Sequence, residues 1–162
     1  MKEVVYLHGL ESKTNCSKVK YLRELGYKVH NPSMDYKNDG CFKKTKELLK
    51  KNNPKAIIGS SMGGYFAYEL GKYFDIPVIL LNPALHSRNF EPKVGNGGEN
   101  HPIVYLAVGG KDDVIDYKKT IKYLSKNSKG FCNSNYLKGN HGHRTPIKIL
   151  EQILLKFNLP YL

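Results

Sequence analysis

The sequence predicts an α/β protein with a doubly wound, largely parallel sheet and helices on both faces. Short β-branched apolar runs alternate with segments whose apolar residues recur at helical spacing. The connections between successive strands are too long for hairpins, which favours right-handed βαβ units. A polar residue follows each of five predicted strands, and sites in such sheets lie beyond the carboxyl ends of the strands. The residues expected to converge on one edge are His8, Ser61, Asn82, Asp112 and His141.

The first half of the chain contains three predicted strand–helix units. Strands are expected at residues 3–7, 27–30 and 56–58, each leading through a turn to a helix. Gly26 is expected to stop the first helix and Asp39 to cap the second. The residues at helical spacing in the three helices are, in order, Val19, Leu22 and Leu25; Phe42, Thr45, Leu48 and Leu49; and Phe66, Ala67, Leu70, Gly71 and Phe74.

The second half continues the alternation after one irregular segment. Strands are expected at residues 77–81, 103–108 and 135–137, and the last of these can be extended back to residue 131. Residues 86–101 have little periodicity and are rich in Gly, Asn and Pro, which predicts a loop or a minimal lid. Thr145-Pro146 is a typical helix start, a cap followed by a first-turn proline. The buried faces are expected to be Ile121 and Leu124 in one helix and Ile147, Leu150, Leu154 and Phe157 in the last.

Length and composition predict one globular domain over residues 1–162. The chain is 40% hydrophobic and has no apolar run long enough to span a membrane. The first residues, MKEVVYLHG, do not resemble a signal peptide, so a cytoplasmic protein is expected. The three cysteines are widely scattered and fit neither a zinc site nor a disulfide framework.

The net charge of +12 raises the question of nucleic-acid binding. Of the 26 basic residues only Arg23, Arg88 and Arg144 are arginine, the residue that reads base edges and clamps phosphates. The lysines are spread through every segment. This pattern favours a solvated surface over a nucleic-acid interface, although the charge would attract an anionic substrate such as an acyl-coenzyme A.

The motif Gly59-Ser60-Ser61-Met62-Gly63 lies between a predicted strand and a predicted helix. In that setting Gly-x-Ser-x-Gly forms a sharp turn that strains the central serine and raises its hydroxyl above the sheet edge. A Cβ on either glycine would collide with the neighbouring strand or helix. Ser61 is therefore the candidate nucleophile, while Ser60 is expected to bond the backbone near the turn.

A serine hydroxyl becomes a nucleophile when an imidazole takes its proton and a carboxylate fixes that imidazole. Ser61, Asp112 and His141 occur in the chain order nucleophile, acid, base. Asp113 is the rival for the acid and Asp116 a weaker one, and both can instead supply charge at a helix N-terminus. His143, two residues after His141, is the rival for the base and can instead be an exposed polar loop residue. No set of His, Asp and Glu has metal-ligand spacing, so no metal is predicted.

The loop after the first strand is expected to complete the site. His8-Gly9 lets the chain approach closely, so that the N–H of Leu10 and the N–H of Met62 face the same developing oxyanion. His8 is expected to order this loop by hydrogen bonding, and His8 and Gly9 to line the substrate site.

Four segments carry a family resemblance: YLHGLES, GSSMGGYFAYELGKYFDIPVILLNPAL, GGKDDVIDY and KGNHGH. They resemble the small YqiA-like esterases of the α/β-hydrolase superfamily, in register over nearly the whole chain. The resemblance implies a compact α/β-hydrolase fold and hydrolysis of esters or thioesters, acyl-coenzyme A among them, through an acyl-enzyme. The segment between Leu85 and Ile103 is shorter than the usual family insertion, so acyl-chain preference does not carry over.

These observations predict a serine esterase or thioesterase that uses no cofactor and acts on a small acyl ester or acyl-CoA. Ser61, His141 and Asp112 form the expected triad, and Leu10 and Met62 the expected oxyanion hole. Two rivals are a catalytically silent binding protein with the same fold and a nucleic-acid binder. The sequence does not fix the acyl-chain length or the oligomeric state.

Overall fold

A computed structural model describes residues 2–88, 91–95 and 98–156 of the 162-residue chain. Within them a six-stranded sheet has the order β2-β1-β3-β4-β5-β6, and each pair of neighbours is parallel. The strands are β1 (Glu3–Leu7), β2 (Lys28–His30), β3 (Ala56–Ser60), β4 (Val78–Leu81), β5 (Val104–Gly109) and β6 (Tyr136–Gly139). The predicted fold class, a parallel sheet of βαβ units, is confirmed.

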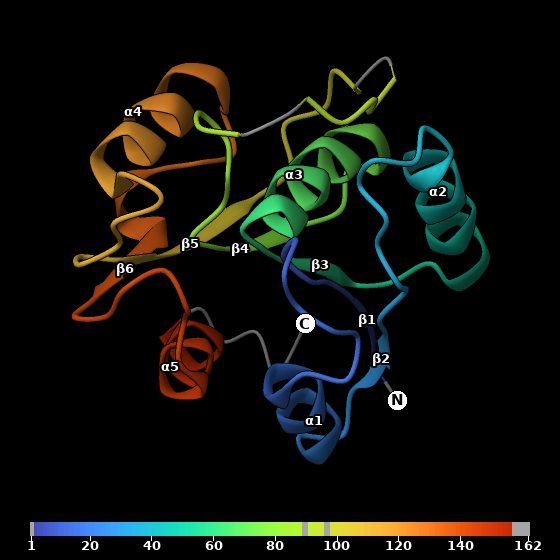
Figure 1. Ribbon diagram of the computed structural model, residues 1–162, viewed down its shortest axis with the longest axis horizontal. Helices are drawn as coiled ribbons and strands as arrows, with labels where there is room; N and C mark the ends of the chain where they lie inside the picture. The colour runs from blue at the N-terminus through green and yellow to red at the C-terminus, as the bar shows by residue number, and fades with distance from the viewer. Residues whose placement is uncertain (1, 89–90, 96–97, 157–162) are drawn as a thin grey trace.

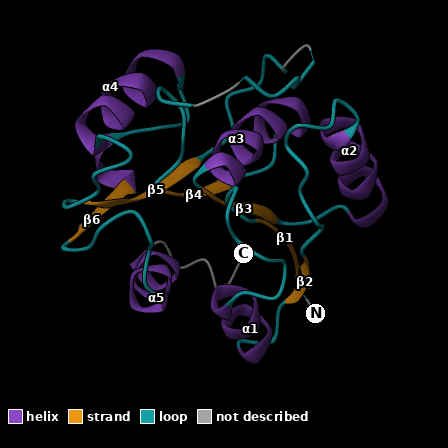
Figure 2. Ribbon diagram, viewed as in Figure 1, coloured by secondary structure: helices purple, strands orange, loops and turns teal. Residues whose placement is uncertain are grey.

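Five α-helices cover the two faces of this sheet. They are α1 (Ser17–Glu24), α2 (Cys41–Asn52), α3 (Met62–Phe74), α4 (Tyr117–Asn127) and α5 (Ile147–Lys156), with a short 3₁₀ turn at Asn133–Asn135. Figure 1 shows α2, α3 and α4 on one face and α1 and α5 on the other. Figure 2 shows the strands crossing the molecule between these layers, as a doubly wound sheet requires.

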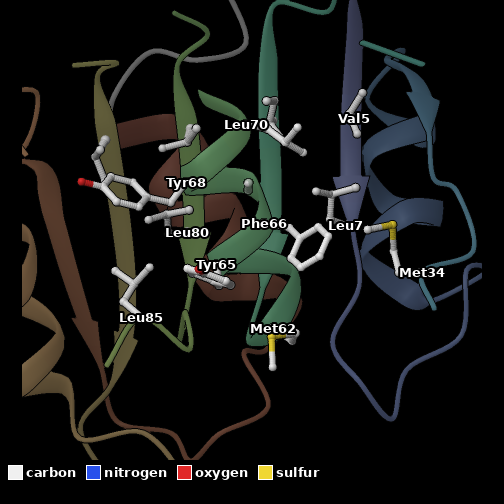
Figure 3. Close-up of a cluster of buried hydrophobic side chains, with 14 of the residues drawn as sticks. Val5, Leu7, Met34, Met62, Tyr65, Phe66, Tyr68, Leu70, Leu80 and Leu85 are labelled. Carbon is white, nitrogen blue, oxygen red and sulfur yellow. The ribbon is translucent and has the colours of Figure 1, made fainter. Parts of the chain in front are cut away.

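Each face of the sheet has its own apolar core, because successive strand residues point to opposite sides. On β1, Val5 and Leu7 join the core under α2, α3 and α4, whereas Val4 and Tyr6 join the core under α1 and α5. Figure 3 shows the first core, in which Phe66 of α3 lies among the side chains around Leu7. Burial of both strand faces explains why the strands read as continuous apolar runs.

Several predicted details of the helices are wrong. The N-cap of α2 is Gly40, whose N–H bonds the Asn38 side chain at 2.8 Å, whereas Asp39 forms an ion pair with Lys93. Leu25 follows α1 and is 47% exposed, because the helix ends one residue earlier. In α5 the buried stripe is Leu150, Ile153 and Leu154, while Ile147 is exposed; Phe157 lies outside the described residues.

The connection after β4 contains neither helix nor strand in its described part, as predicted for residues 86–101. Arg88 in this connection packs against α3. The Arg88 guanidinium lies 4.0 Å from the centre of the Tyr65 ring and donates to the carbonyls of Ala84 and Leu85. In the described part of the chain, no helix combines the length and the apolar character needed to cross a bilayer.

The order of the strands selects one place on the sheet edge. From β1 the chain first adds β2 on one side and then places β3 on the other side of β1. In open α/β sheets, ligands bind at such a switch point, beyond the carboxyl ends of the strands. The turn after β1 and the turn after β3 meet here.

Candidate active site

Ser61 occupies a strained turn between β3 and α3. Its backbone has φ 53° and ψ −116°, outside the regions that non-glycine residues favour. A Cβ at Gly59 would overlap the carbonyl of Gly63, and a Cβ at Gly63 would overlap the carbonyl of Leu7. The predicted strain and the predicted need for both glycines are therefore confirmed, and the turn brings the nucleophile candidate against the end of β1.

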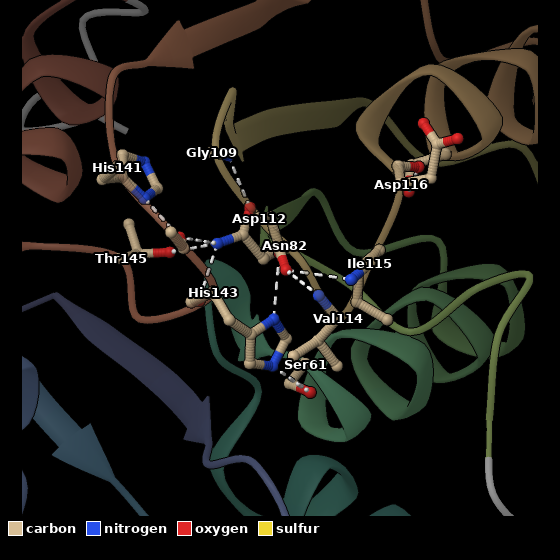
Figure 4. Close-up of polar contacts among 12 residues, drawn as sticks. Ser61, Asn82, Gly109, Asp112, Val114, Ile115, Asp116, His141, His143 and Thr145 are labelled. Carbon is tan, nitrogen blue, oxygen red and sulfur yellow. Dashed lines mark hydrogen bonds and ion pairs between the residues drawn. The ribbon is translucent and has the colours of Figure 1, made fainter.

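A continuous chain of hydrogen bonds joins Ser61, His143 and Asp112 (Figure 4). His143 Nε2 lies 3.0 Å from Ser61 Oγ, and His143 Nδ1 lies 2.9 Å from Asp112 Oδ2. An ionised carboxylate only accepts hydrogen bonds, so Nδ1 carries the proton and Nε2 is left to accept the serine hydroxyl. This is the arrangement in which an imidazole can take a proton from serine.

The predicted position of His141 over Ser61 is wrong. Its Nδ1 bonds the carbonyl of its neighbour Gly142 at 2.8 Å, and its ring lies against Gly139 at the end of β6. A Cβ at Gly139 would stand 2.5 Å from the His141 ring, so the missing side chain makes room for this histidine. The loop turns after His141 and presents His143, the less favoured of the two candidates, to the serine.

Asp112 is bound on both of its oxygens. While Oδ2 faces His143, Oδ1 accepts the N–H groups of Val114 and Ile115, each at 2.9 Å, and the side chain is fully buried. These contacts fix the plane of the carboxylate. Asp113 is exposed, and Asp116 Oδ1 accepts the N–H of Lys118 at 2.8 Å as the cap of α4.

The loop after β1 lies beside the serine. A Cβ at Gly9 would stand 3.3 Å from the Ser61 Cβ, so glycine allows this close approach. Met62 begins α3, and the first N–H groups of a helix have no partner within it. Leu10 follows Gly9 and is 44% exposed. The two predicted oxyanion donors therefore belong to the two turns that meet at the switch point.

His8 is buried beneath this loop and is bonded on both ring nitrogens. Its Nε2 accepts the N–H of Met34 at 3.2 Å, which leaves the proton on Nδ1 to donate to the carbonyl of Gly9 at 2.7 Å. The Tyr36 hydroxyl donates to the carbonyl of His8. Burial raises the pKa of Tyr36, so this hydroxyl stays protonated. The predicted ordering role of His8 agrees with these contacts.

The five strand-exit residues thus gather at one edge, but at different depths. Ser61 and Asp112 contact the reacting imidazole, and His8 supports the loop beside the serine. Asn82 lies behind His143, and His141 faces α5. Across residues 2–88, 91–95 and 98–156, no three His, Cys, Asp or Glu side chains are grouped to hold a metal ion.

Comparison with protein families matches residues 3–105 to UPF0227, described as an uncharacterised protein family. The chain belongs to the UPF0227 family. Its curated UPF0227 relatives include YcfP of Escherichia coli (strain K12) and a protein of Enterobacter sp. strain 638, each 29% identical over 117 residues. These matches cover 65% of this chain and 64% of each relative's length.

Solved structures show that this UPF0227 protein has the α/β-hydrolase fold. An esterase of Pyrococcus furiosus superposes with a TM-score of 0.71 at 17% identity, covering 99% of this chain and 80% of the esterase. An alpha/beta hydrolase enzyme from the metagenome of Moroccan lagoon sediments gives a TM-score of 0.70 at 16% identity, covering 98% and 89%. The predicted α/β-hydrolase fold is therefore confirmed.

The family match ends within β5 of this UPF0227 protein. It includes the turn around Ser61 and the loop around Gly9, but neither Asp112 nor His143. The acid and the base are therefore assigned by geometry alone. Their proximity to Ser61 is an observation independent of the family match.

Proposed function

We propose that this UPF0227 protein is a serine hydrolase that cleaves carboxylic esters or acyl thioesters through an acyl-enzyme. The observation that carries the proposal is the hydrogen-bonded chain from Ser61 Oγ through His143 to the buried Asp112 carboxylate. The esterases among the solved structures of the same fold support the same reaction class.

The first half of the reaction acylates the enzyme. Ser61 Oγ attacks the acyl carbonyl as His143 Nε2 takes the hydroxyl proton, and Asp112 stabilises the imidazolium that forms. The N–H groups of Leu10 and Met62 are the proposed donors to the oxyanion, at the junction of the two turns. His143 then returns the proton to the departing alkoxide or thiolate.

The second half releases the acid. Water donates a proton to His143 and attacks the acyl-serine carbonyl, after which collapse of the tetrahedral intermediate expels Ser61 and restores its hydroxyl. His8 and Gly9 shape the floor of the proposed acyl site. A small acyl ester or an acyl-CoA is the proposed substrate, and the excess of lysine favours the approach of anionic substrates.

The decisive experiment is labelling by a fluorophosphonate probe, which reacts only with an activated serine. The wild-type protein should be labelled, and Ser61→Ala should be folded but unlabelled. Absence of labelling in the folded wild-type protein contradicts the proposal and favours a catalytically silent binding protein. Turnover of p-nitrophenyl esters of increasing chain length, measured beside acyl-CoA substrates, then distinguishes esterase from thioesterase.

A further inference from the structure

Asn82, the first residue after β4, has an unusual environment for a loop asparagine. It is 2% exposed, and its backbone has φ 43°, in the left-handed region that asparagine tolerates better than most residues. A buried amide is costly unless its groups are bonded. Asn82 meets this requirement with partners from two other segments of the chain.

The amide of Asn82 connects the end of β5 to the loop that carries His143 (Figure 4). Its Oδ1 accepts the N–H of Gly109 at 2.7 Å. Its Nδ2 lies 2.7 Å from the carbonyl of His143, with the carbonyl of Gly142 at 3.2 Å and Thr145 Oγ1 at 3.3 Å. A flipped amide would set donor against donor and acceptor against acceptor, so the network allows one orientation only.

The turn that contains Asn82 also holds the nucleophile. Ser61 donates its N–H to the carbonyl of Leu81 at 3.0 Å, and Ala84 donates its N–H to the carbonyl of Ser61 at 2.9 Å. Asn82 itself donates its backbone N–H to the carbonyl of Ala107 in β5 at 2.9 Å. One four-residue turn therefore contacts the backbone of the nucleophile on one side and the backbone of the base on the other.

We propose that Asn82 is a positioning residue, which holds the His143 backbone so that the imidazole reaches Ser61 Oγ and Asp112 Oδ2 together. This inference rests on the proposed function. The Asn82 side chain bonds Gly109 and the His143 loop, and acts by holding the His143 carbonyl against the turn that bonds the Ser61 backbone. A displacement of about 1 Å at a reacting group can cost about 100-fold in rate, so loss of this anchor should impair the chemical step.

Two variants of Asn82 distinguish the effect of its side-chain amide from the effect of its backbone conformation. Asn82→Gly keeps the left-handed conformation and removes all the amide bonds. Asn82→Asp keeps the acceptor for Gly109 but presents an oxygen to the carbonyls of Gly142 and His143. The matched control is Asn53→Gly, since Asn53 follows α2 at φ 42°, within one degree of the φ of Asn82. A second control is Asn31→Asp, since the Asn31 amide donates to the Thr14 carbonyl at 2.7 Å.

Ester hydrolysis gives the first readout. Both Asn82 variants should lose kcat by about 100-fold with KM changed by less than about threefold, because the contact acts on the chemical step and not on substrate binding. The two controls should keep kcat within about twofold. An Asn82→Gly protein that folds and keeps wild-type kcat overturns the inference.

A proton NMR signal gives a readout that does not require activity. The Nδ1–H of His143 should appear far downfield in the wild-type protein, identified by its loss in Asp112→Asn, and should be lost or shifted in the Asn82 variants. An unchanged signal in a folded Asn82→Gly protein contradicts the inference. If wild-type protein fails to react with fluorophosphonate but this signal depends on Asn82, the proposed function fails while the positioning inference stands.

If Asn82→Gly does not fold, Thr145→Val supplies the test, because it removes one acceptor of the same amide. Its kcat should fall several-fold at unchanged KM, and the Nδ1–H signal should shift. An unaltered kcat and signal in Thr145→Val then count against the positioning role.

Discussion

The turn around Ser61 and the loop that carries His143, residues 140–145, are held in place by different means. The Ser61 turn depends on backbone proximity: Gly59 and Gly63 leave no room for a side chain, and no side chain caps α3. The His143 loop also contacts backbone, since Lys111 donates its N–H to the His141 carbonyl at 3.0 Å. It has side-chain anchors in addition: Asp112 bonds the imidazole and Asn82 bonds the His143 carbonyl. Ser61 is therefore held by backbone contacts, whereas the position of His143 depends in addition on individual side-chain hydrogen bonds.

This difference implies different responses to mutation. Changes in the glycines of the Ser61 turn should act on folding, because the backbone cannot move without disturbing β1 and β3. Changes in the side chains that hold the His143 loop should act on the rate while the fold survives. Four predictions test this contrast, in order of decreasing effect.

The largest effect on kcat is expected from replacing His143, with His141 as the comparison. His143→Ala should reduce kcat by about 10⁴-fold to 10⁶-fold, because the serine loses its base. His141→Ala should keep kcat within about tenfold, because its ring packs against Gly139 and does not reach the serine. Parallel measurements of ester hydrolysis on the two folded proteins decide the matter. A loss in His141→Ala equal to that in His143→Ala would contradict the geometry.

Replacement of the adjacent acids Asp112 and Asp113 should likewise have unequal effects on kcat. Asp112→Asn should lower kcat by about 10⁴-fold, because an amide no longer holds the proton on Nδ1 of His143. Asp113→Asn should change kcat by less than about threefold, since this side chain is exposed. The two variants carry the same change of charge, so a comparable loss in both would point to general electrostatics and not to a specific acid.

Replacing a glycine by alanine should destabilise the protein more in the Ser61 turn than in the His143 loop. Gly63→Ala should lower the free energy of unfolding by more than about 3 kcal/mol, because the methyl group overlaps the Leu7 carbonyl. Gly142→Ala, beside His143, should cost less than about 1 kcal/mol, since its Cβ would meet only the Lys111 carbonyl at 3.6 Å. Urea unfolding measures both. Equal losses of stability in the two variants would contradict the proposed difference between the Ser61 turn and the His143 loop.

The smallest effect is expected at Tyr36, which supports the loop after β1. Tyr36→Phe should lower stability by about 1–2 kcal/mol, because the buried His8 carbonyl loses its donor. Burial raises the pKa of Tyr36, so the folded protein holds this proton more tightly than the unfolded chain. The difference in free energy of unfolding between wild type and Tyr36→Phe should be constant below about pH 9. It should decline above about pH 10, where the tyrosine of the unfolded chain ionises. Denaturation curves from pH 6 to pH 11 check both points.

The fold and the Ser61 turn were predictable because their signals are local. An apolar run, two glycines around a serine and a helical period lie within twenty residues, and each requires the same backbone path. A carboxylate after β5 was predictable from the strand exit, but this position did not separate Asp112 from Asp113. The sheet therefore followed from periodicity, with errors confined to helix ends such as the cap of α2, where Asn38 bonds Gly40.

The base was not predictable, because the choice between His141 and His143 depends on contacts distant in sequence. Asn82, 61 residues earlier, bonds the His143 carbonyl, and Asp112 bonds the His143 imidazole. Two histidines separated by one glycine carry no local signal for this choice. The structure supplies the missing distinction, because Gly139 provides space for the His141 ring.

The sequence order of the site has a consequence for biosynthesis. The loop after β1 and Ser61 are translated first, whereas Asp112 follows β5 and His143 follows β6. A nascent chain that has reached only residue 105 would contain the serine without the groups that activate it. On the proposed mechanism, esterolytic competence would arise only once translation has passed residue 143 and the final strand has docked.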